Sequence, residues 1–356
     1  MRIGIVGAGI VGLATAAALA AAGHEVRCYD SGEPMAARSL GETRIFRTAH
    51  AEPGMVELAL RAQRSWQRWE KQFGTRLVDP VTTVLNGAEA TVRATAMQAA
   101  GAPFSLRDDA AGLGLPASDP RGPFLVDAGG GVINVTAAGC GLRETLGSQV
   151  RAHDLVRGVD VLGADHVRIA ADSGAWDCHA ALLLAGAGTP ALAAAVGIGG
   201  VPHGRWHSHR FTFALRDASA RPPCWLERSE SWRAGVTSYQ HLVGPGRWAV
   251  GASVPDADSA WELGRDGTRN RAEDIVRAYV AEQVDGVVPD VLDTISCDSM
   301  NLGDGLGFGR SGPVLALWGD NLMKLAPLLG ELLASAALDR DREVRDDDVP
   351  HLVATE

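Results

Sequence analysis

The sequence predicts an α/β protein, α+β overall, in which one domain has a parallel sheet with helices and a second has a mostly antiparallel sheet. Two stretches, 2–22 and 181–197, each consist of an apolar run, glycines and an alanine-rich segment, which is typical of parallel strands joined by helices. Residues 199–296 instead contain strand-like segments, such as 210–215 and 248–254, among several tryptophans. A chain of 356 residues has room for both domains.

The first stretch carries the most specific motif. Its apolar run, 2–6, is long enough for one buried strand, and Gly7, Gly9 and Gly12 follow as G-x-G-x-x-G. Gly7 permits a tight turn, Gly9 lets a pyrophosphate approach the backbone, and Gly12 lets the next helix pack on the strand. This motif predicts a phosphate-binding turn.

A second strand and an acidic residue complete the motif. The alanine-rich helix is expected to end at Ala22, followed by Gly23 as a stop, and 25–29 is a predicted strand that leads to Asp30. Asp30 lies 18 residues (30 − 12) after Gly12, about where a carboxylate binds a ribose hydroxyl. Because these features occur in order, the sequence predicts a Rossmann-like dinucleotide-binding domain.

Composition limits the function classes. The net charge of −10 argues against a nucleic-acid partner, and no glycine-free apolar run is long enough to cross a membrane. The first predicted strand begins at residue 2, so we expect no signal peptide and a cytoplasmic location. The five cysteines are scattered, which suggests a reducing compartment without a disulfide framework or zinc site. A monomer is plausible.

The remaining elements follow from local patterns. A helix is predicted at 55–73, and prolines punctuate 79–131. A helix is expected to restart at 131–134 and run to about 146. Further predicted elements are strands at 150–157, 159–162, 166–170 and 313–317, helices at 271–283 and from the turn 318–321 to about 338, and a charged, peripheral tail at 339–356. The expected domains are 1–78, 132–198 and 297–356 for the cofactor, and 79–131 and 199–296 for the substrate.

Three further segments carry a resemblance to a known family. SLGETRIFRTAH at 39–50 resembles monomeric sarcosine oxidase and N-methyltryptophan oxidase, and LLAGAGT at 183–189 is similar to D-amino-acid-oxidase-type flavoproteins. GDNLMKLAPLLGELLASAAL at 319–338 resembles glycine oxidase, and its lysine matches the sarcosine oxidase pattern. The chain therefore resembles the sarcosine, glycine and N-methyltryptophan oxidase branch of the FAD-dependent D-amino-acid-oxidase superfamily, closely in the blocks at both ends and loosely across 79–131 and 199–296.

This resemblance implies one FAD per chain and a set of residues around it. Gly7, Gly9, Gly12 and Asp30 would hold the ADP half. Gly186 would let the backbone pass close to the cofactor. Ser39, Thr43 and Arg44 would follow the pyrophosphate and the flavin ring, and Asn321, Leu322, Met323 and Lys324 would lie at its pyrimidine end. A helix N-terminus there favours the anionic reduced flavin.

Two cations match the residues that hold the substrate carboxylate in the sarcosine oxidase branch. They are Arg47 and Lys324, and the alternative is that both are solvated surface residues. Lys324 lies at or just before the first turn of its helix, where a cation is unfavourable by ~0.3–1 kcal/mol. An anionic substrate would offset that cost.

The sequence departs from the family pattern at two positions. Cys297 lies near the family's position of covalent flavin attachment, but the family has a tyrosine where this sequence has Ser299. Cys297 is therefore either the attachment residue or an ordinary buried cysteine. The lysine that activates O₂ in sarcosine oxidase aligns with Ala249, and Arg247 is the nearest cation in the sequence. Either another group assists O₂ or the electron acceptor differs.

The expected function is FAD-dependent oxidation of a secondary amine or N-substituted amino acid by O₂. Hydride passes to flavin N5, the imine is hydrolysed and H₂O₂ is released. The two matching cations suggest a substrate with a carboxylate beside the oxidised C–N bond, and the tryptophans of 199–296 suggest a bulky, apolar remainder, so we expect a glycine-type amine. Oxidation at its CH₂ gives glyoxylate, whereas oxidation on the side of the substituent gives glycine. The alternatives are a flavin dehydrogenase with another acceptor, an NAD-binding dehydrogenase and a non-catalytic flavin protein. A metal site at His203, His207 and His209 is not expected.

Overall fold

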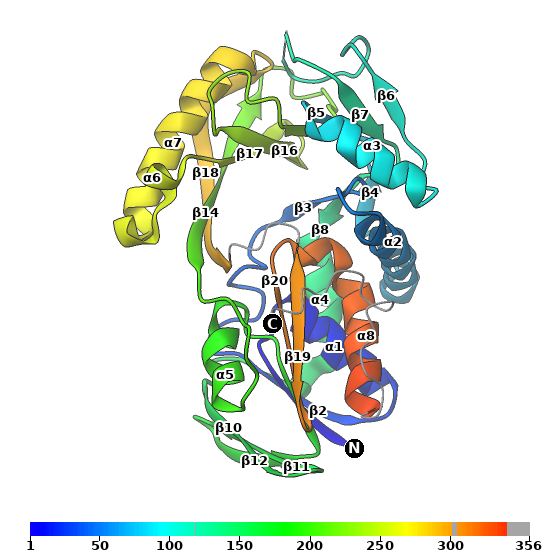
Figure 1. The fold of residues 1–356 in the computed structure, drawn as a ribbon, viewed down its shortest axis with the longest axis vertical. Helices are drawn as coiled ribbons and strands as arrows, with labels where there is room; N and C mark the ends of the chain where they lie inside the picture. The colour runs from blue at the N-terminus through cyan, green and yellow to red at the C-terminus, as the bar shows by residue number, and fades with distance from the viewer. Residues whose placement is uncertain (118, 301–304, 340–356) are drawn as a thin grey trace.

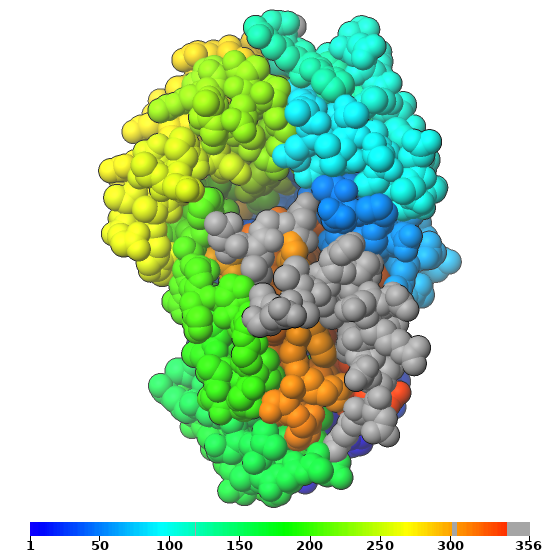
Figure 2. All heavy atoms as spheres, viewed as in Figure 1, coloured from blue at the N-terminus to red at the C-terminus, as the bar shows by residue number. Residues whose placement is uncertain are grey.

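The computed structural model describes residues 1–117, 119–300 and 305–339. Within these ranges the strands form four sheets. The parallel strands and the large antiparallel sheet occupy opposite halves of an elongated molecule (Figure 1). In the space-filling view from the same side, 83–127 and most of 205–300 form the upper half, and 150–200 lies in the lower half (Figure 2). None of the helices in the described ranges is long and apolar enough to cross a membrane.

The lower half is built on a parallel sheet with the strand order β19-β20-β13-β1-β2-β9. Neighbouring strands are parallel except the edge strand β19, which is antiparallel to β20. The predicted strands at 2–6 and 25–29 are confirmed. The strands are β1 (Arg2–Val6), β2 (Glu25–Tyr29), β9 (Val150–Arg151), β13 (Ala180–Leu183), β19 (Leu306–Ser311) and β20 (Val314–Gly319).

Both faces of the parallel sheet are covered. One face packs against the helices α1 (Ile10–Ala21), α2 (Pro53–Phe73), α4 (Val135–Leu146) and α8 (Ala326–Leu338) around a buried apolar core. The other face packs against α5 (Thr189–Ala195) and the sheet of β10 (Val156–Gly163), β11 (His166–Ala171) and β12 (Gly174–Cys178). Each large side chain buried in these cores contributes roughly 1.5–3 kcal/mol. Short 3₁₀ turns are η1 (Gly147–Gln149), η2 (Gly186–Gly188) and η4 (Leu322–Leu325).

The upper half is built on a large sheet with the order β18-β14-β17-β16-β15-β5-β7-β6. Only its β5–β15 pair is parallel among the described strands, so the predicted antiparallel character is confirmed. The strands are β5 (Thr83–Asn86), β6 (Ser105–Arg107), β7 (Phe124–Asp127), β14 (Arg205–Leu215), β15 (Cys224–Glu227), β16 (Thr237–Gly244), β17 (Arg247–Ser253) and β18 (Val287–Met300). The accompanying helices are α3 (Glu89–Ala99), α6 (Asp256–Ser259), η3 (Trp261–Leu263) and α7 (Gly264–Gln283).

Strand register gives the large sheet two different faces. On the outer face, apolar residues such as Phe211 and Trp248 are fully buried in a core that includes α7. On the other face, which we call the inner face, Arg210 pairs with Gly251, and Gly251 pairs with Tyr239. Paired residues of antiparallel strands point to the same side. The inner face therefore carries Ser208, Arg210, Thr212, Tyr239, His241, Ala249, Gly251, Ile295 and Cys297.

A small sheet of β3 (Thr43–Phe46), β8 (Gly131–Asn134) and β4 (Val78–Pro80) lies between the two large sheets (Figure 1). Here the prediction of a helix restarting at 131–134 is wrong. These residues form β8, because their backbone pairs with β3 and β4, and the helix begins only at Val135. Asn134 caps that helix by accepting a hydrogen bond from the Ala137 amide at 2.9 Å.

The strand expected at 150–157 is two strands, because β9 ends at Arg151 and β10 begins at Val156. β9 pairs with β2 in the parallel sheet, whereas β10 pairs with β11 in a different sheet. The predicted peripheral tail at 339–356 lies outside the described residues after Asp339.

Candidate active site

The glycine motif forms a tight turn between β1 and α1. Gly7 has a φ of +108°, and a Cβ there would lie 2.3 Å from the Leu184 carbonyl oxygen. A Cβ on Gly12 would lie 1.8 Å from the Gly7 carbonyl oxygen. Both positions therefore require glycine. Gly9 is the N-cap of α1 and supplies no side-chain cap, which is the arrangement at helix N-termini that bind phosphate groups.

Asp30 and Ser39 both lie at this turn. Asp30 Oδ2 accepts a hydrogen bond from the Ala8 amide at 2.8 Å, and its Oδ1 accepts one from the Gly32 amide at 3.0 Å. Ser39 Oγ accepts from the Ile10 amide at 3.0 Å. Three segments that are separate in sequence thus meet where the motif predicts the ADP half of the cofactor.

Thr43 connects this region to the inner face of the large sheet. Its carbonyl oxygen accepts from Arg210 Nη1 at 2.7 Å, and its hydroxyl lies 3.0 Å from His241 Nε2. The guanidinium groups of Arg44 and Arg210 both lie against Gly41. A Cβ on Gly41 would be 2.9 Å from Arg44 Nη1 and 2.9 Å from Arg210 Nη2, so the two arginines are neighbours. The predicted segment at 39–50 therefore contacts residues of β14 and β16 that the sequence did not single out.

Positive charge at this contact is poorly compensated. Burial, together with the nearby Arg210 and Arg38, lowers the pKa of Arg44 to about 9. Because arginine hardly ever loses its proton in a protein, the lowered pKa indicates how unfavourable positive charge is here. Burial also lowers the pKa of Arg210, and burial with the two arginines holds the pKa of His241 well below its ordinary value.

Two of these side chains have buried nitrogens without a hydrogen-bond partner. Within the described ranges, Nε and Nη2 of Arg210 and Nδ1 of His241 have no acceptor or donor. Arg210 is 4% exposed. A buried charged donor without an acceptor costs more than the ~1–3 kcal/mol of a neutral one. The arrangement indicates that a polar or anionic group belongs beside Arg210.

Arg38 links the inner face to the last turn before α8. Its Nη2 and Nε donate to Asp320 Oδ1 at 2.8 and 3.1 Å, and its Nη1 donates to Cys297 Sγ at 3.1 Å. Burial opposes the charge of Arg38, but Asp320 and Cys297 outweigh it and raise the pKa above its ordinary range. Cys297 is thus a buried thiol that is held by a cation at the inner face.

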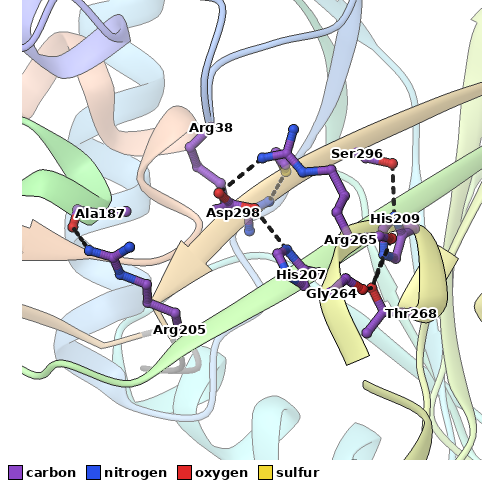
Figure 3. A network of polar contacts seen from close by, with 11 residues as sticks. Arg38, Ala187, Arg205, His207, His209, Gly264, Arg265, Thr268, Ser296 and Asp298 are labelled. Carbon is purple, nitrogen blue, oxygen red and sulfur yellow. Dashed lines mark hydrogen bonds and ion pairs between the residues drawn. The ribbon is translucent and has the colours of Figure 1, made fainter. Parts of the chain in front are cut away.

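The neighbours of Cys297 in β18 point to the outer face, where they form a polar network with β14 and α7 (Figure 3). Asp298 Oδ1 lies 2.9 Å from His207 Nδ1, and its Oδ2 accepts from Arg265 at 3.0 Å. The His207 ring stacks on Trp261 with ring centroids 4.1 Å apart. The network therefore ties β14, β18 and α7 together directly behind Cys297.

His209 belongs to the same network. Its Nδ1 lies 2.8 Å from Ser296 Oγ, and its Nε2 lies 2.9 Å from Thr268 Oγ1. Burial, with the neighbouring His207 and two arginines of α7, lowers the pKa of His209 to about 4, so the ring is neutral at pH 7. Among the described residues, no group of three or more His, Cys, Asp and Glu side chains is arranged to hold a metal ion.

The two predicted substrate cations are buried. Arg47 follows β3 and is 8% exposed, and Lys324 lies in η4 and is 5% exposed. β3 packs against η4, which brings the two segments together. Arg47 Nη1 lies 3.4 Å from His50 Nδ1 and also donates to the Ala49 carbonyl oxygen. The alternative of two solvated surface residues is wrong, whereas their contact with substrate stays a prediction.

The turn expected at the pyrimidine end of the flavin has defined backbone geometry. Asn321 has a φ of +53° and directly precedes η4, in which Met323 and Lys324 are buried. Trp66 of α2 donates to the Lys324 carbonyl oxygen at 2.8 Å and so fixes the position of this turn. Gly186 has a φ of +55°, and a Cβ there would contact nothing within 4 Å, so its backbone is open on that side. Roles for these residues and for Leu322 stay predictions.

Sequence reasoning missed Arg38, Arg210 and His241, because none belongs to a local motif. One signal was present. In β14 the buried phenylalanines at 211 and 213 alternate with Arg210 and Thr212, so a charged residue had to lie on the second face. The cation that was singled out, Arg247, is instead paired with Glu42 at 3.3 Å and Asp293 at 3.9 Å.

Comparison with protein families decides the cofactor. Residues 2–336 match the family described as FAD dependent oxidoreductase. The chain belongs to this family. The predictions of the superfamily, of FAD and of an oxidoreductase are confirmed, and the alternatives of an NAD-binding dehydrogenase and of a non-catalytic flavin protein are wrong.

Solved structures share the fold of this FAD-dependent oxidoreductase. The open form of NikD, described as an unusual amino acid oxidase essential for nikkomycin biosynthesis, has a TM-score of 0.80 and 18% identity over 98% of this chain and 96% of that one. Glycine oxidase from Geobacillus kaustophilus has a TM-score of 0.77 and 15% identity over 96% of each chain. L-proline dehydrogenase from P. horikoshii has a TM-score of 0.75 and 15% identity over 98% and 95%. No curated protein sequence matches.

The residues of the site fit FAD. The glycine turn leaves the N-terminus of α1 without a side-chain cap from Gly9, and a larger side chain there would fill the space that a diphosphate needs. Asp30 lies at the end of β2, where a ribose hydroxyl is expected. The cationic inner face suits a cofactor that becomes anionic when reduced.

Proposed function

We propose that this oxidoreductase oxidises the C–N bond of an amino acid or N-substituted amino acid. The observation that supports this most is the pair of buried cations, Arg47 and Lys324, on segments that pack together. An amino acid offers a carboxylate, and arginine and lysine side chains bind carboxylates through charge-assisted hydrogen bonds.

The chain would contribute orientation and electrostatics. Arg47 and Lys324 hold the carboxylate and so fix the adjacent C–N bond, while burial of both side chains keeps water away from it. Bound FAD supplies the acceptor for the hydride that leaves the substrate carbon. Water then hydrolyses the imine. We assign no side-chain base, because a neutral amine can lose hydride without one.

Within this class we propose a glycine-type amine, HOOC–CH₂–NH–R. Oxidation at the CH₂ would consume O₂ and water and give glyoxylate, R–NH₂ and H₂O₂. The resemblance of 319–338 to glycine oxidase supports this choice. The tryptophans give less support for a bulky R than the sequence suggested, because Trp225 and Trp248 are buried in the core on the outer face.

Anaerobic reduction of the bound flavin tests the substrate class. The purified holoenzyme is mixed without O₂ with a panel of N-alkyl glycines, primary amino acids and the corresponding amines that lack the carboxylate. We expect N-alkyl glycines to bleach the flavin fastest. Faster bleaching by the amines without a carboxylate would contradict the proposal.

A second candidate is a dehydrogenase that passes electrons to an acceptor other than O₂. The observation that favours it is Ala249, an inner-face residue that stands where sarcosine oxidase has its O₂-activating lysine. O₂ consumption compared with dye reduction, at the same substrate concentration, distinguishes the two functions.

We also propose a covalent link between Cys297 and the flavin. The contact of Arg38 with Cys297 Sγ supports it, because this contact holds the sulfur at the inner face, where the flavin is expected. After acid precipitation, we expect a yellow pellet from the wild type and a colourless pellet from Cys297→Ser. A yellow supernatant from the wild type, or a yellow pellet from the variant, would show that Cys297 does not carry the link.

The domain division fits this proposal. Residues 1–78, 132–198 and 297–356 would form the FAD-binding domain, and 79–131 and 199–296 the substrate domain. The membership of β1, β2, β13 and β20 in the parallel sheet, and of β5, β7 and β14 to β17 in the large sheet, supports this division. The boundary between 296 and 297 is less well supported, because it falls inside β18, which pairs with β14 in the large sheet up to Met300.

A further inference from the structure

The inner face contains a buried cation that forms no ion pair in the described ranges, because Glu42 and Asp293 act on it only from beyond contact distance. Arg210 is buried, two of its nitrogens lack an acceptor, and its Nη1 donates only to the Thr43 carbonyl oxygen among the described residues. Arg44 lies beside it, across Gly41, and neither arginine forms an ion pair in the described part of the chain. Two adjacent cations that no carboxylate contacts attract a small anion.

Arg247 provides a contrast on the same face. It pairs with Gly244 and Ala214 in β16 and β14, and its guanidinium contacts Glu42 and Asp293. Its side chain is 38% exposed, so its charge is both paired and screened. The uncompensated charge is therefore specific to the neighbourhood of Arg210 and Arg44.

We propose that Arg210, with Arg44 beside it, forms a small-anion site in which O₂ is reduced. The proposal rests on the proposed oxidase function. O₂ takes two electrons and one proton from the reduced cofactor and one proton from solvent, giving H₂O₂ and the oxidised cofactor. The first electron makes superoxide, an anion, and a fixed buried cation stabilises it as it forms. Arg210 would thus take the role that sarcosine oxidase gives to a lysine at the position where this chain has Ala249.

Rapid mixing of the reduced holoenzyme with O₂ tests the site. The flavin is reduced photochemically, so the test does not depend on the identity of the substrate, and its reoxidation is followed by absorbance. We expect Arg210→Met to slow reoxidation roughly 10²–10³-fold, as for the loss of one preorganised donor. Arg210→Lys should retain most of the rate, and the matched control Arg247→Met should behave as the wild type.

Two readouts need no turnover. Because Arg210→Met removes an uncompensated buried charge, the Tm of the apoprotein should rise by about 2–4 °C, whereas Arg247→Met should leave it unchanged or lower it. Chloride, used as a monovalent anion, should perturb the flavin spectrum of the wild type and slow its reoxidation, and Arg210→Met should remove both effects.

Four results would overturn the proposal. They are slow reoxidation of the wild type itself, wild-type reoxidation in Arg210→Met, a lower apoprotein Tm in that variant, and loss of FAD from it, which would make Arg210 a cofactor-holding residue. A failure of every amine to reduce the flavin anaerobically would instead contradict the proposed function, and the photochemical experiment would still decide the role of Arg210.

Discussion

Single residues set the geometry of the phosphate turn, and Gly12 makes the sharpest prediction. Its hydrogen points at the Gly7 carbonyl oxygen, so the Cβ of Gly12→Ala would overlap that atom. We expect the turn to open and purified Gly12→Ala to lose most of its flavin absorbance relative to protein. Gly32→Ala is the control, because a Cβ there meets nothing within 4 Å and the residue lies nearby. Full FAD content in Gly12→Ala would show that the turn is not required.

Local spacing in the sequence predicted the residues of the phosphate turn but not the arginines at the inner face. Gly7, Gly12 and Asp30 belong to a single strand–helix–strand unit, so spacing alone predicted their position in the fold, while their contact with FAD stays a prediction. The side chains of Arg38 and Arg210 meet the candidate site through contacts with residues far away in sequence. Because such contacts depend on the packing of two sheets, no pattern within a short window could assign them.

Among the elements, the β14–β18–α7 network predicts acid sensitivity. The lowered pKa of His209, about 4, means that between pH 6.5 and pH 4 the unfolded ring gains a proton and the folded ring does not. The unfolded state then binds more protons, so stability falls as pH falls. We expect the free energy of unfolding to drop by ~1–2 kcal/mol more in the wild type than in His209→Gln when the pH goes from 7 to 4.5.

Urea unfolding at both pH values measures this difference. The groups that face His209 are His207, Arg265, Arg269 and Asp298, and all remain in the variant. The exposed His203→Gln is the control and should keep the wild-type pH dependence. Equal acid destabilisation of the wild type and His209→Gln would show that other groups cause it.

The contact of α1 with α8 gives a second prediction for the elements. A Cβ on Gly330 would lie 2.7 Å from the backbone carbon and the Cβ of Ala14, so Gly330→Ala forces the two helices apart. We expect a loss of roughly 1–3 kcal/mol of stability, as for other overpacked cores, measured by thermal unfolding of the apoprotein. FAD affinity should also fall, because both helices carry parts of the site. Gly199→Ala, where a Cβ meets nothing, should have no effect.

The elements themselves were predicted well where their periodicity was local. The helix at 55–73 lies within the observed α2, and the strand at 25–29 matches β2. The error at 131–134 has a physical cause. Asn134 is a helix cap, and the sequence signal for that cap was interpreted as part of a helix that had already begun, whereas pairing with β3 and β4 makes the preceding residues a strand.

In the whole molecule, the site lies where the two large sheets approach each other (Figure 1). The parallel sheet supplies the glycine turn and η4, and the inner face of the large sheet supplies Arg210, His241 and Cys297. The sequence predicted both halves, because each has its own pattern of strands. It could not predict how the halves meet, because the residues that the large sheet brings to the contact, Arg210 and His241, fit no motif.

The most direct test of the account compares two substrates in three enzymes. Anaerobic flavin reduction is measured for the wild type, Arg47→Ala and Lys324→Ala with an N-alkyl glycine and with the amine of the same bulk that lacks the carboxylate. Loss of one charge-assisted contact costs about 1.5–3 kcal/mol. We therefore predict that each variant slows flavin reduction by the acidic amine roughly 10–100-fold at low substrate concentration. The rate of reduction by the uncharged amine should change much less. Equal losses for both substrates would mean that Arg47 and Lys324 support the flavin or the fold, and would contradict the account.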